Sequence, residues 1–338
     1  MIKQKPKVAF YWCASCGGCE ETVVDLNAAI LDVADAVDIV LWPVALDFKY
    51  HHIEALKDGD IAVSFINGAI RTNEQAHISK LLRQKSGLVV AFGSCAHTGG
   101  IPGLANLTSR EEIFRTSFHE SPTVVNASGT VPQEDSLADG MPVRLPAFWE
   151  EVHTLDQWID VDYYIPGCPP PPALVLSAVT AILEGKLPEK GSVLAPAKAL
   201  CDTCPRRKTK SENTKITKIH RPHEIIADPE ICFLEQGIIC CGPATRSGCG
   251  EVCINGNMPC TGCFGPPPGV IDQGAKLISA ISSLFNAKTK EEAMEMARQV
   301  VDPAGTFHRY TVPSSLLGCR IHKKAAMPAD GRMDREAA

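Results

Sequence analysis

The stretch CASCGGCEE, which begins at Cys13, holds three cysteines within seven residues and two glycines between the last two cysteines. So dense a group of thiols suits a disulfide knot, a zinc site or an iron–sulfur cluster. The whole chain has 15 cysteines, an odd number that fits poorly with a fully paired disulfide framework. The N-terminus lacks the features of a signal peptide, and no apolar run has the length of a transmembrane helix. We therefore expect a cytoplasmic protein whose cysteines bind metal.

The chain is long enough for two domains, and its charge argues against a nucleic-acid partner. It has 338 residues, 45% of them hydrophobic, and a net charge of -6. A local basic stretch covers residues 206–210, and further Lys and Arg residues follow as far as Arg221. The simplest interpretation of this stretch is a solvated linker. The alternative is a docking surface for an acidic partner.

Apolar runs alternate with helical spacing in the first half of the chain. The predicted strands cover residues 7–12, 37–42, 60–66, 87–93 and 161–167, and the predicted helices cover about 20–33, 76–84 and 172–185. Such alternation indicates βαβ units and a parallel sheet that is covered on both faces. We predict a flavodoxin-like, doubly wound α/β domain over residues 1–190. Within it, residues 105–155 read as a long loop with short helices.

The amino-acid composition of the sequence changes after about residue 190. Residues 191–268 are dense in Cys, Gly and Pro, and we predict an irregular iron–sulfur domain that needs metal to fold. Helical spacing returns at about 275–287 and 290–301, so residues 269–338 are predicted to form a helical extension and a tail.

Four cysteines of the first half each follow a predicted strand. Cys16 and Cys19 follow the first strand, Cys95 follows the strand at 87–93, and Cys168 follows the strand at 161–167. Ligands in open parallel sheets bind beyond the carboxyl ends of the strands, so the fold would bring these thiols to one edge. Four gathered thiolates suit a [4Fe–4S] cluster, although structural zinc and unliganded buried thiols remain alternatives.

The second half supplies enough cysteines for two more sites of four. They are Cys201, Cys204, Cys232, Cys240, Cys241, Cys249, Cys253, Cys260 and Cys263. Leaving out one of the adjacent pair Cys240 and Cys241 gives eight thiols. Paired zinc ribbons remain possible for these eight. Three iron–sulfur clusters in one chain would form an electron-conducting wire, which zinc could not.

Several motifs together resemble the small, electron-transfer subunit of [NiFe]-hydrogenases. They are CGGC, GSCAHTGG, PGCPPPP, CDTCPR, CFLEQGIICCGPATRSGCG and PCTGCFGP. Within that family the chain is most similar to the cytoplasmic F420-non-reducing, or methyl-viologen-reducing, type that partners heterodisulfide reductase. The resemblance covers nearly the whole chain apart from about the last dozen residues.

The resemblance implies a cluster assignment for twelve cysteines. A proximal [4Fe–4S] cluster would be bound by Cys16, Cys19, Cys95 and Cys168, a distal one by Cys201, Cys204, Cys232 and Cys240, and a medial one by Cys249, Cys253, Cys260 and Cys263. Cys201 stands where the periplasmic enzymes place a histidine. Cys253 stands where enzymes with a [3Fe–4S] medial cluster place a proline, so four thiolates imply [4Fe–4S] here.

Three cysteines are left over, and two of them compete with assigned ligands. Cys13 could replace Cys16, although C-x-G-C favours Cys16, and Cys241 could replace Cys240. Cys319 reads as a small buried apolar residue. Weaker candidates follow. Glu20 could help to move protons or could be a first-turn helix acid, and His97 could donate a hydrogen bond to the cluster or be a structural histidine. His220 and His223 could bind a metal together or be ordinary loop residues.

The resemblance places H2 cleavage in a separate large subunit that holds nickel and iron. This chain would pass single electrons from the proximal to the medial to the distal cluster, and then to an iron–sulfur adaptor subunit and a flavin-containing heterodisulfide reductase. No G-x-G-x-x-G follows a predicted strand, so we expect no NAD or FAD on this chain. The alternatives are the small subunit of an F420-reducing or NAD(P)-reducing hydrogenase, and a zinc-stabilised scaffold without redox function. The related complex I subunit keeps only the proximal site, and the eight extra cysteines argue against it.

Overall fold

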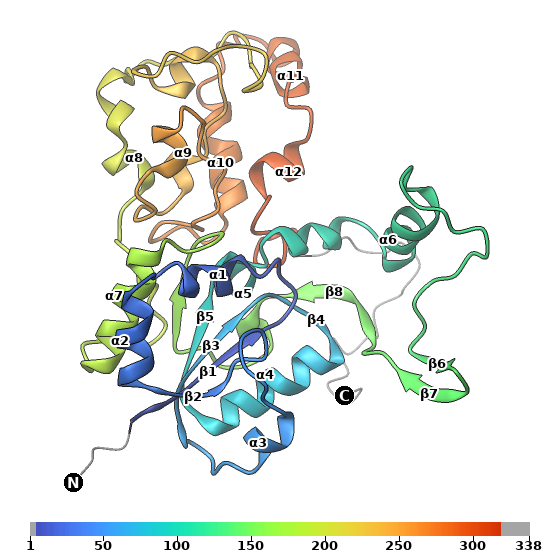
Figure 1. The fold of residues 1–338 in the computed structure, drawn as a ribbon. Helices are drawn as coiled ribbons and strands as arrows, with labels where there is room; N and C mark the ends of the chain where they lie inside the picture. Colours follow the sequence, from blue (N-terminus) through green and yellow to red (C-terminus); the bar gives the residue numbers. More distant parts are fainter. Residues whose placement is uncertain (1–4, 319–338) are drawn as a thin grey trace, which may run out of the picture.

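The computed structural model describes residues 5–318, and its N-terminal half is built on a five-stranded parallel sheet (Figure 1). The strands are β1 (Lys7–Trp12), β2 (Asp38–Leu41), β3 (Ile61–Asn67), β5 (Ser86–Phe92) and β9 (Tyr163–Ile165). They lie in the order β2-β1-β3-β5-β9, which is the strand order of flavodoxin-like sheets. The predicted doubly wound sheet is therefore confirmed, and most strand bounds differ from the predicted ones by a residue or two.

Helices cover both faces of the sheet, and the alternation of side chains along each strand divides the core in two. Val8 and Phe10 of β1 pack into one apolar cluster, while Ala9 and Tyr11 pack into the other. The first face is covered by α1 (Gly18–Val24), α2 (Ala29–Ala36) and α7 (Pro172–Leu183), and the second by α3 (Tyr50–Glu54) and α4 (Asn73–Lys85). This period of two is what a parallel sheet buried on both sides requires.

The helix predicted over 20–33 is wrong as a single element. The chain forms two short helices instead, α1 and α2, because Asp25 caps the first and Asn27 adopts a left-handed conformation with φ of 54°. Leu26 at this turn is buried, so its apolar character fitted the helical pattern although its backbone does not. The helix predicted over 275–287 also ends earlier, at Ser282.

The region predicted as a long loop contains strands as well as short helices. The helical segments within this region or overlapping its ends are η1 (Ile101–Leu107), α6 (Arg110–Arg115), η2 (Thr116–Glu120) and η3 (Leu155–Gln157), and the strands are β6 (Asp135–Ala138), β7 (Met141–Arg144) and β8 (Phe148–His153). The short helix α5 (Ser94–Thr98) precedes the region. β6 and β7 form a hairpin, and β8 pairs with β4 (Ile70–Thr72) beside the main sheet. Residues 108–148, which we call the arm, project away from the sheet in Figure 1. Sequence reasoning missed the hairpin because its strands face solvent on both sides and lack an alternating pattern.

The cysteine-rich part lies beyond the carboxyl ends of the sheet strands (Figure 1). Its helical segments are α8 (Leu200–Thr203), η4 (Pro205–Thr209), η5 (Phe233–Gln236), η6 (Gly242–Ala244), α9 (Val252–Asn255), α10 (Gln273–Ser282), α11 (Lys290–Arg298) and α12 (Pro303–Phe307). The cysteine-rich segments and the C-terminal helices share one apolar core, because Leu277 and Ile281 of α10 and Phe307 of α12 pack against Leu200 and Phe233. The fold class with an irregular cysteine-rich part is confirmed, while the predicted boundaries after residues 190 and 268 stay predictions.

The end of the described chain ties the two parts together. The Thr98 hydroxyl donates to the Tyr310 carbonyl at 2.7 Å, and the Gln157 amide donates to the Pro313 carbonyl at 2.8 Å. A Cβ added at Gly99 would lie 2.3 Å from the Pro313 ring, so the two segments touch closely. No helix between residues 5 and 318 combines the length and apolar character that crossing a bilayer requires.

Candidate metal centre

The predicted proximal set, Cys16, Cys19, Cys95 and Cys168, comes together at the carboxyl edge of the sheet. Cys16 follows β1, Cys19 lies in α1, Cys95 lies in α5 directly after β5, and Cys168 follows β9. Backbone bonds align the last two turns, because Gly93 N–H donates to the Ile165 carbonyl at 2.8 Å and Ser94 N–H to the Gly167 carbonyl at 2.7 Å. The fold thus assembles four thiols from three distant segments, as expected from their positions after the strand ends.

Glycines leave the space around these sulfurs open. A Cβ added at Gly93, where φ is +84°, would lie 2.3 Å from Cys19 Sγ. A Cβ added at Gly100 would lie 2.5 Å from Cys95 Sγ. Gly18 N–H is aimed at Cys16 Sγ at 3.5 Å. Close backbone approach and N–H groups that point at sulfur are what a thiolate-bound group needs.

Burial raises the pKa of three proximal thiols, Cys19, Cys95 and Cys168, and neighbouring thiols raise it further. Desolvation is the larger cause of the raised pKa of Cys19, followed by the charges of Cys95, Cys168 and Cys16. Burial likewise raises the pKa of Cys95 to about 12. Without a positive group between them these sulfurs hold their protons, so the site is built for a cationic centre that displaces those protons.

The predicted distal set is Cys201, Cys204, Cys232 and Cys240, and two of its sulfurs lie beside Gly242. Burial raises the pKa of Cys201 to about 12, and the charges of Cys240, Cys204 and Cys232 add to it. A Cβ added at Gly242 would lie 3.2 Å from Cys201 Sγ and 3.6 Å from Cys240 Sγ. The structure therefore brings these four thiols together around a backbone that approaches closely.

The predicted medial set, Cys249, Cys253, Cys260 and Cys263, lies between the other two. Burial raises the pKa of Cys263 to about 12, and the charges of Cys249 and Cys253 contribute. Cys253 in α9 is exposed, whereas Cys260 is buried. Cys260 has a raised pKa, chiefly from burial and then from the charges of Cys240, Cys241 and Cys263.

Two sulfur pairs link the three sets in a line. Among neighbouring charges, that of Cys168 in the proximal set has the largest effect on the pKa of Cys263 in the medial set, and the Ser94 hydroxyl next to Cys95 donates to the Cys263 carbonyl. At the other end, the charge of Cys240 in the distal set has the largest such effect on the pKa of medial Cys260. The medial set therefore borders both of the others. Within residues 5–318, however, no three His, Cys, Asp or Glu side chains converge closely enough to hold a single metal ion.

Cys13 and Cys241, the alternatives to Cys16 and Cys240 as ligands, have definite places in the structure. Cys13 is buried in the opposite core from Cys19, with its sulfur 3.8 Å from the Ser79 hydroxyl on α4. The Cys13 N–H donates to the Asn67 carbonyl at 2.8 Å, so the strand pairing continues past β1 and turns this side chain away from the proximal set. Cys241 donates its thiol to the Thr306 carbonyl at 3.8 Å, towards α12. Cys319 lies outside the described residues.

The weaker candidates have definite places. Glu20 is buried and accepts hydrogen bonds from the Trp42 indole and the Asn67 amide, so it is more than an exposed first-turn acid. His97 is half-buried beside the Tyr164 ring, and its buried Nδ1 has no hydrogen-bond partner among the described residues. Burial lowers the pKa of His97 to about 4, so the ring is neutral. His220 lies 3.9 Å from Glu224, and no three-residue metal group forms there within residues 5–318.

Two residues where the proximal and medial sets adjoin, Ser94 and Tyr310, could not be identified from the sequence. The Ser94 hydroxyl donates to the Cys263 carbonyl, and the Tyr310 hydroxyl lies 3.3 Å from the Thr261 hydroxyl. Both bonds join segments that are far apart in the chain, so only the tertiary structure reveals them.

Arg206 corrects the interpretation of residues 206–210 as a solvated linker. Its side chain is buried under the Phe233 ring, with the guanidinium carbon 4.0 Å from the ring centre. It donates to the Asp228 carbonyl at 3.0 Å and to the Asn257 side chain at 2.7 Å. Arg207, by contrast, is exposed and pairs with Asp202, next to Cys201.

We expect Arg206→Met to destabilise the protein by at least about 3 kcal/mol, because buried acceptors lose a charged donor. Arg207→Met should cost less than about 1 kcal/mol, since it removes one exposed ion pair. The free energy of unfolding of the two variants checks this, and equal losses would contradict the structural role of Arg206.

Comparisons with known proteins match this architecture. Residues 16–182 match the model of the family described as NADH ubiquinone oxidoreductase, 20 Kd subunit. The chain is 37% identical to the iron–sulfur subunit of the F420-non-reducing hydrogenase of Archaeoglobus profundus, over 94% of this chain and 99% of that protein. It is 36% identical to a subunit of the F420-non-reducing hydrogenase of Methanothermobacter marburgensis, over 96% and 99% of the two chains.

A solved structure shares the fold. A chain of the [NiFeSe] hydrogenase from Desulfovibrio vulgaris Hildenborough superposes with a TM-score of 0.50 at 18% identity, over 85% of this chain and 99% of that chain. The identity of 36–37% to the two archaeal proteins extends over nearly the full length of each chain, and it is far more specific than this likeness of fold. The chain therefore belongs to the iron–sulfur subunits of F420-non-reducing hydrogenases, which are [NiFe]-hydrogenase small subunits whose nickel–iron site lies in a separate large subunit.

Proposed function

We propose that this chain holds three [4Fe–4S] clusters and carries electrons from H2 oxidation in the large subunit to an acceptor protein. The observation that carries the proposal is the line of three cysteine sets, in which Ser94 next to Cys95 bonds to the Cys263 carbonyl and the Cys241 N–H next to Cys240 donates to the Cys260 carbonyl at 2.9 Å. When bound, such clusters supply one-electron transfer at each site. The residues fit them, because each set offers four thiols, and glycines at the proximal and distal sets leave space beside the sulfurs.

The chain's own residues set the ends of this line. Cys16 of the proximal set is exposed, so a partner that covers it could exchange electrons with the proximal cluster there. Cys201, Cys204 and Cys232 of the distal set are only partly buried, so electrons can leave to a second partner at that end. The medial set is held between them by Cys260, which is buried, and by the bond from the Ser94 hydroxyl to the Cys263 carbonyl.

We further propose that the second partner is an iron–sulfur adaptor subunit, which passes electrons to heterodisulfide reductase in the cytoplasm. The support is the resemblance to the F420-non-reducing type together with the 36–37% identity, over nearly the whole chain, to two archaeal subunits of that type. The test is to purify the native complex without oxygen and supply H2. Reduction of methyl viologen supports the hydrogenase role, and H2-dependent reduction of heterodisulfide supports the adaptor route. Reduction of F420 or NAD(P) instead would contradict it.

Cys253→Pro should convert the medial cluster towards the [3Fe–4S] form, because it removes one thiolate. Cys253 lies in the first turn of α9, where a missing N–H costs little, so the fold should persist. EPR of the oxidised complex should show a new three-iron signal and a higher medial potential. An unchanged set of [4Fe–4S] signals would contradict the assignment of Cys253 as a ligand.

A further inference from the structure

The β6–β7 hairpin of the arm has no packing partner among residues 5–318. All of its strand residues are exposed, including Leu137 at 74% and Met141 at 64% of their maximal surface. Val125, in the same arm, is 97% exposed. An isolated two-stranded hairpin is marginally stable at best in water. The arm therefore carries apolar surface that gains stability only when something covers it.

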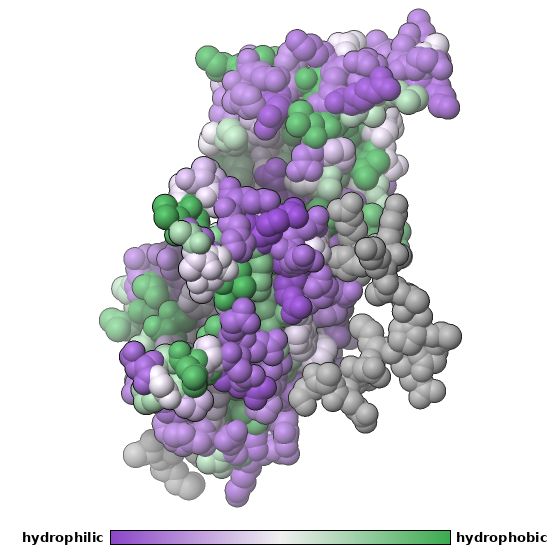
Figure 2. Space-filling view, turned by 90° about the vertical axis from the view of Figure 1, so that its right-hand side faces the viewer, coloured by the Kyte–Doolittle hydropathy of each residue, from purple (hydrophilic) through white to green (hydrophobic). Residues whose placement is uncertain are grey.

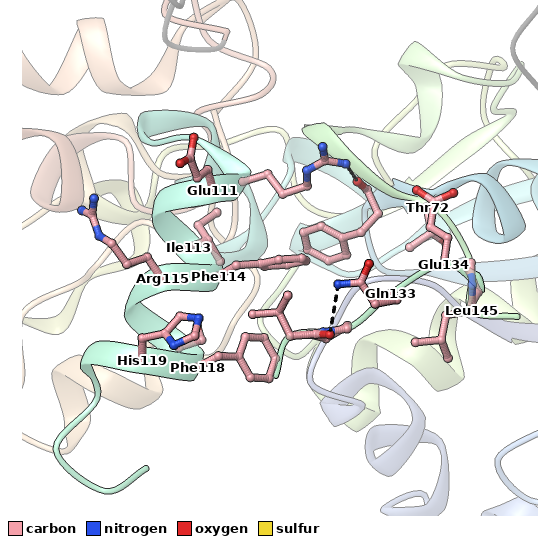
Figure 3. A pocket seen from close by; sticks show the side chains of 16 residues that line it. Thr72, Glu111, Ile113, Phe114, Arg115, Phe118, His119, Gln133, Glu134 and Leu145 are labelled. Atoms are coloured by element: carbon pink, nitrogen blue, oxygen red, sulfur yellow. Dashed lines mark hydrogen bonds between the residues drawn. The ribbon is translucent and has the colours of Figure 1, made fainter. Parts of the chain in front are cut away.

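An apolar pocket lies within the arm. It has a volume of about 990 Å³ and is lined on one side by α6 and η2 and on the other by residues 131–134 and 145–148. Figure 3 shows the Phe114 and Phe118 rings pointing from the helical side into this space, opposite Leu145 and Thr72. Arg115 points away from it. The pocket thus offers aromatic walls to an apolar side chain of a partner.

The base of the arm is fixed, so the pocket is held open. The Phe114 and Phe148 rings lie 5.4 Å apart, and the guanidinium of buried Arg71 lies 4.4 Å from the Phe148 ring centre. Arg110 donates to the Phe148 carbonyl at 2.8 Å. The Ser109 side chain caps α6. A pocket braced in this way does not need to form when the partner arrives.

The arm continues from the edge of the sheet where Cys16 is exposed. α5 carries Cys95, and η1 leads from it to α6, beginning at Ile101, which is 45% exposed (Figure 1). Trp12, beside Cys16, is also partly exposed at 39%. On the face drawn in Figure 2, hydrophobic residues lie in several separate groups among hydrophilic ones. The chain thus runs directly from Cys95 at the proximal edge through η1 into the arm, and it exposes the apolar side chain of Ile101 on the way.

We propose that the arm, residues 108–148, is a clasp for the hydrogenase large subunit, and that an apolar segment of that subunit fills the pocket. The choice of partner rests on the proposed function, because the subunit that delivers electrons to the proximal set must cover Cys16 and hence meets the start of the arm. The apolar and aromatic lining fits a protein segment with Leu-like or aromatic anchors.

The first test places a photo-crosslinking residue at Leu137 in the native complex. The expected product is an adduct with the large subunit, identified by mass spectrometry of the purified complex. An adduct with residues 319–338 of the same chain, with a second copy of this chain, or with any other subunit would overturn the proposal.

The second test replaces exposed side chains, which leaves the core of the subunit intact. Leu137→Asp combined with Met141→Asp should weaken retention of the large subunit by at least tenfold in a salt wash of the immobilised complex. Ile226→Asp is the matched control, since Ile226 is 98% exposed but lies in the cysteine-rich part. Equal retention in both variants would overturn the clasp. The iron content of the isolated small subunit should be the same in both variants. Viologen reduction by the unaltered complex tests the proposed function separately.

Discussion

Cys19→Ala should remove the proximal cluster, whereas Cys13→Ala should leave all clusters in place. Both cysteines are buried and lie in the same short stretch of sequence. Cys19 faces the other three proximal thiols, but Cys13 points into the opposite core towards Ser79. Loss of one cluster removes about four iron atoms per chain, and H2-dependent viologen reduction should fall to the background rate because the wire loses its entry.

The measurement is iron per chain in each anaerobically purified variant, together with the viologen rate. Cys13→Ala should cost only about 1 kcal/mol of stability, as expected for a small buried side chain. If Cys13→Ala loses iron and Cys19→Ala does not, Cys13 is the ligand and the proximal assignment fails.

Gly93→Ala should also empty the proximal site, although it changes no ligand. The new Cβ would lie 2.3 Å from Cys19 Sγ, so the sulfur must move, and φ of +84° strains the backbone as well. Gly59→Ala is the matched control, because its φ is +77° and its new Cβ would meet nothing within 4 Å. Both variants bear backbone strain of about 1–3 kcal/mol from positive φ, and the strain is the larger at Gly93, where ψ is 167°, but only Gly93→Ala displaces a ligand.

The visible absorption of the bound clusters, compared with iron content and melting temperature, separates the two effects. We expect both variants to melt at lower temperature, and Gly93→Ala alone to lose iron. Retention of full iron by Gly93→Ala would mean that Cys19 Sγ does not occupy its assigned place when the cluster is bound.

The sheet could be predicted because its physical signal is local. Buried parallel strands read as short apolar runs, and β1, β3 and β5 each show one. The strand-end rule then placed Cys16, Cys95 and Cys168 at one edge. The helix break at Asn27 was beyond such reasoning, because Leu26 keeps the apolar spacing while the backbone turns.

Other features depend on contacts that sequence spacing does not encode. The orientation of Cys13 follows from its backbone bond to Asn67, which lies in a different strand. The position of Cys263 beside the proximal set, shown by its carbonyl bond from Ser94, depends on how the cysteine-rich part sits on the sheet. Arg206 looked like one of several surface cations, and only its contact with Phe233 shows that it is structural. The β6–β7 hairpin gave no period-two pattern because neither of its faces is buried.

The most direct test of the account is the metal content of the native complex of large and small subunits, purified without oxygen. Three [4Fe–4S] clusters on this chain predict about twelve iron and twelve labile sulfide per small subunit, with nickel and further iron in the large subunit. About four iron per small subunit would leave only the proximal site. Zinc in place of iron would contradict the electron-transfer role of the cysteine-rich part.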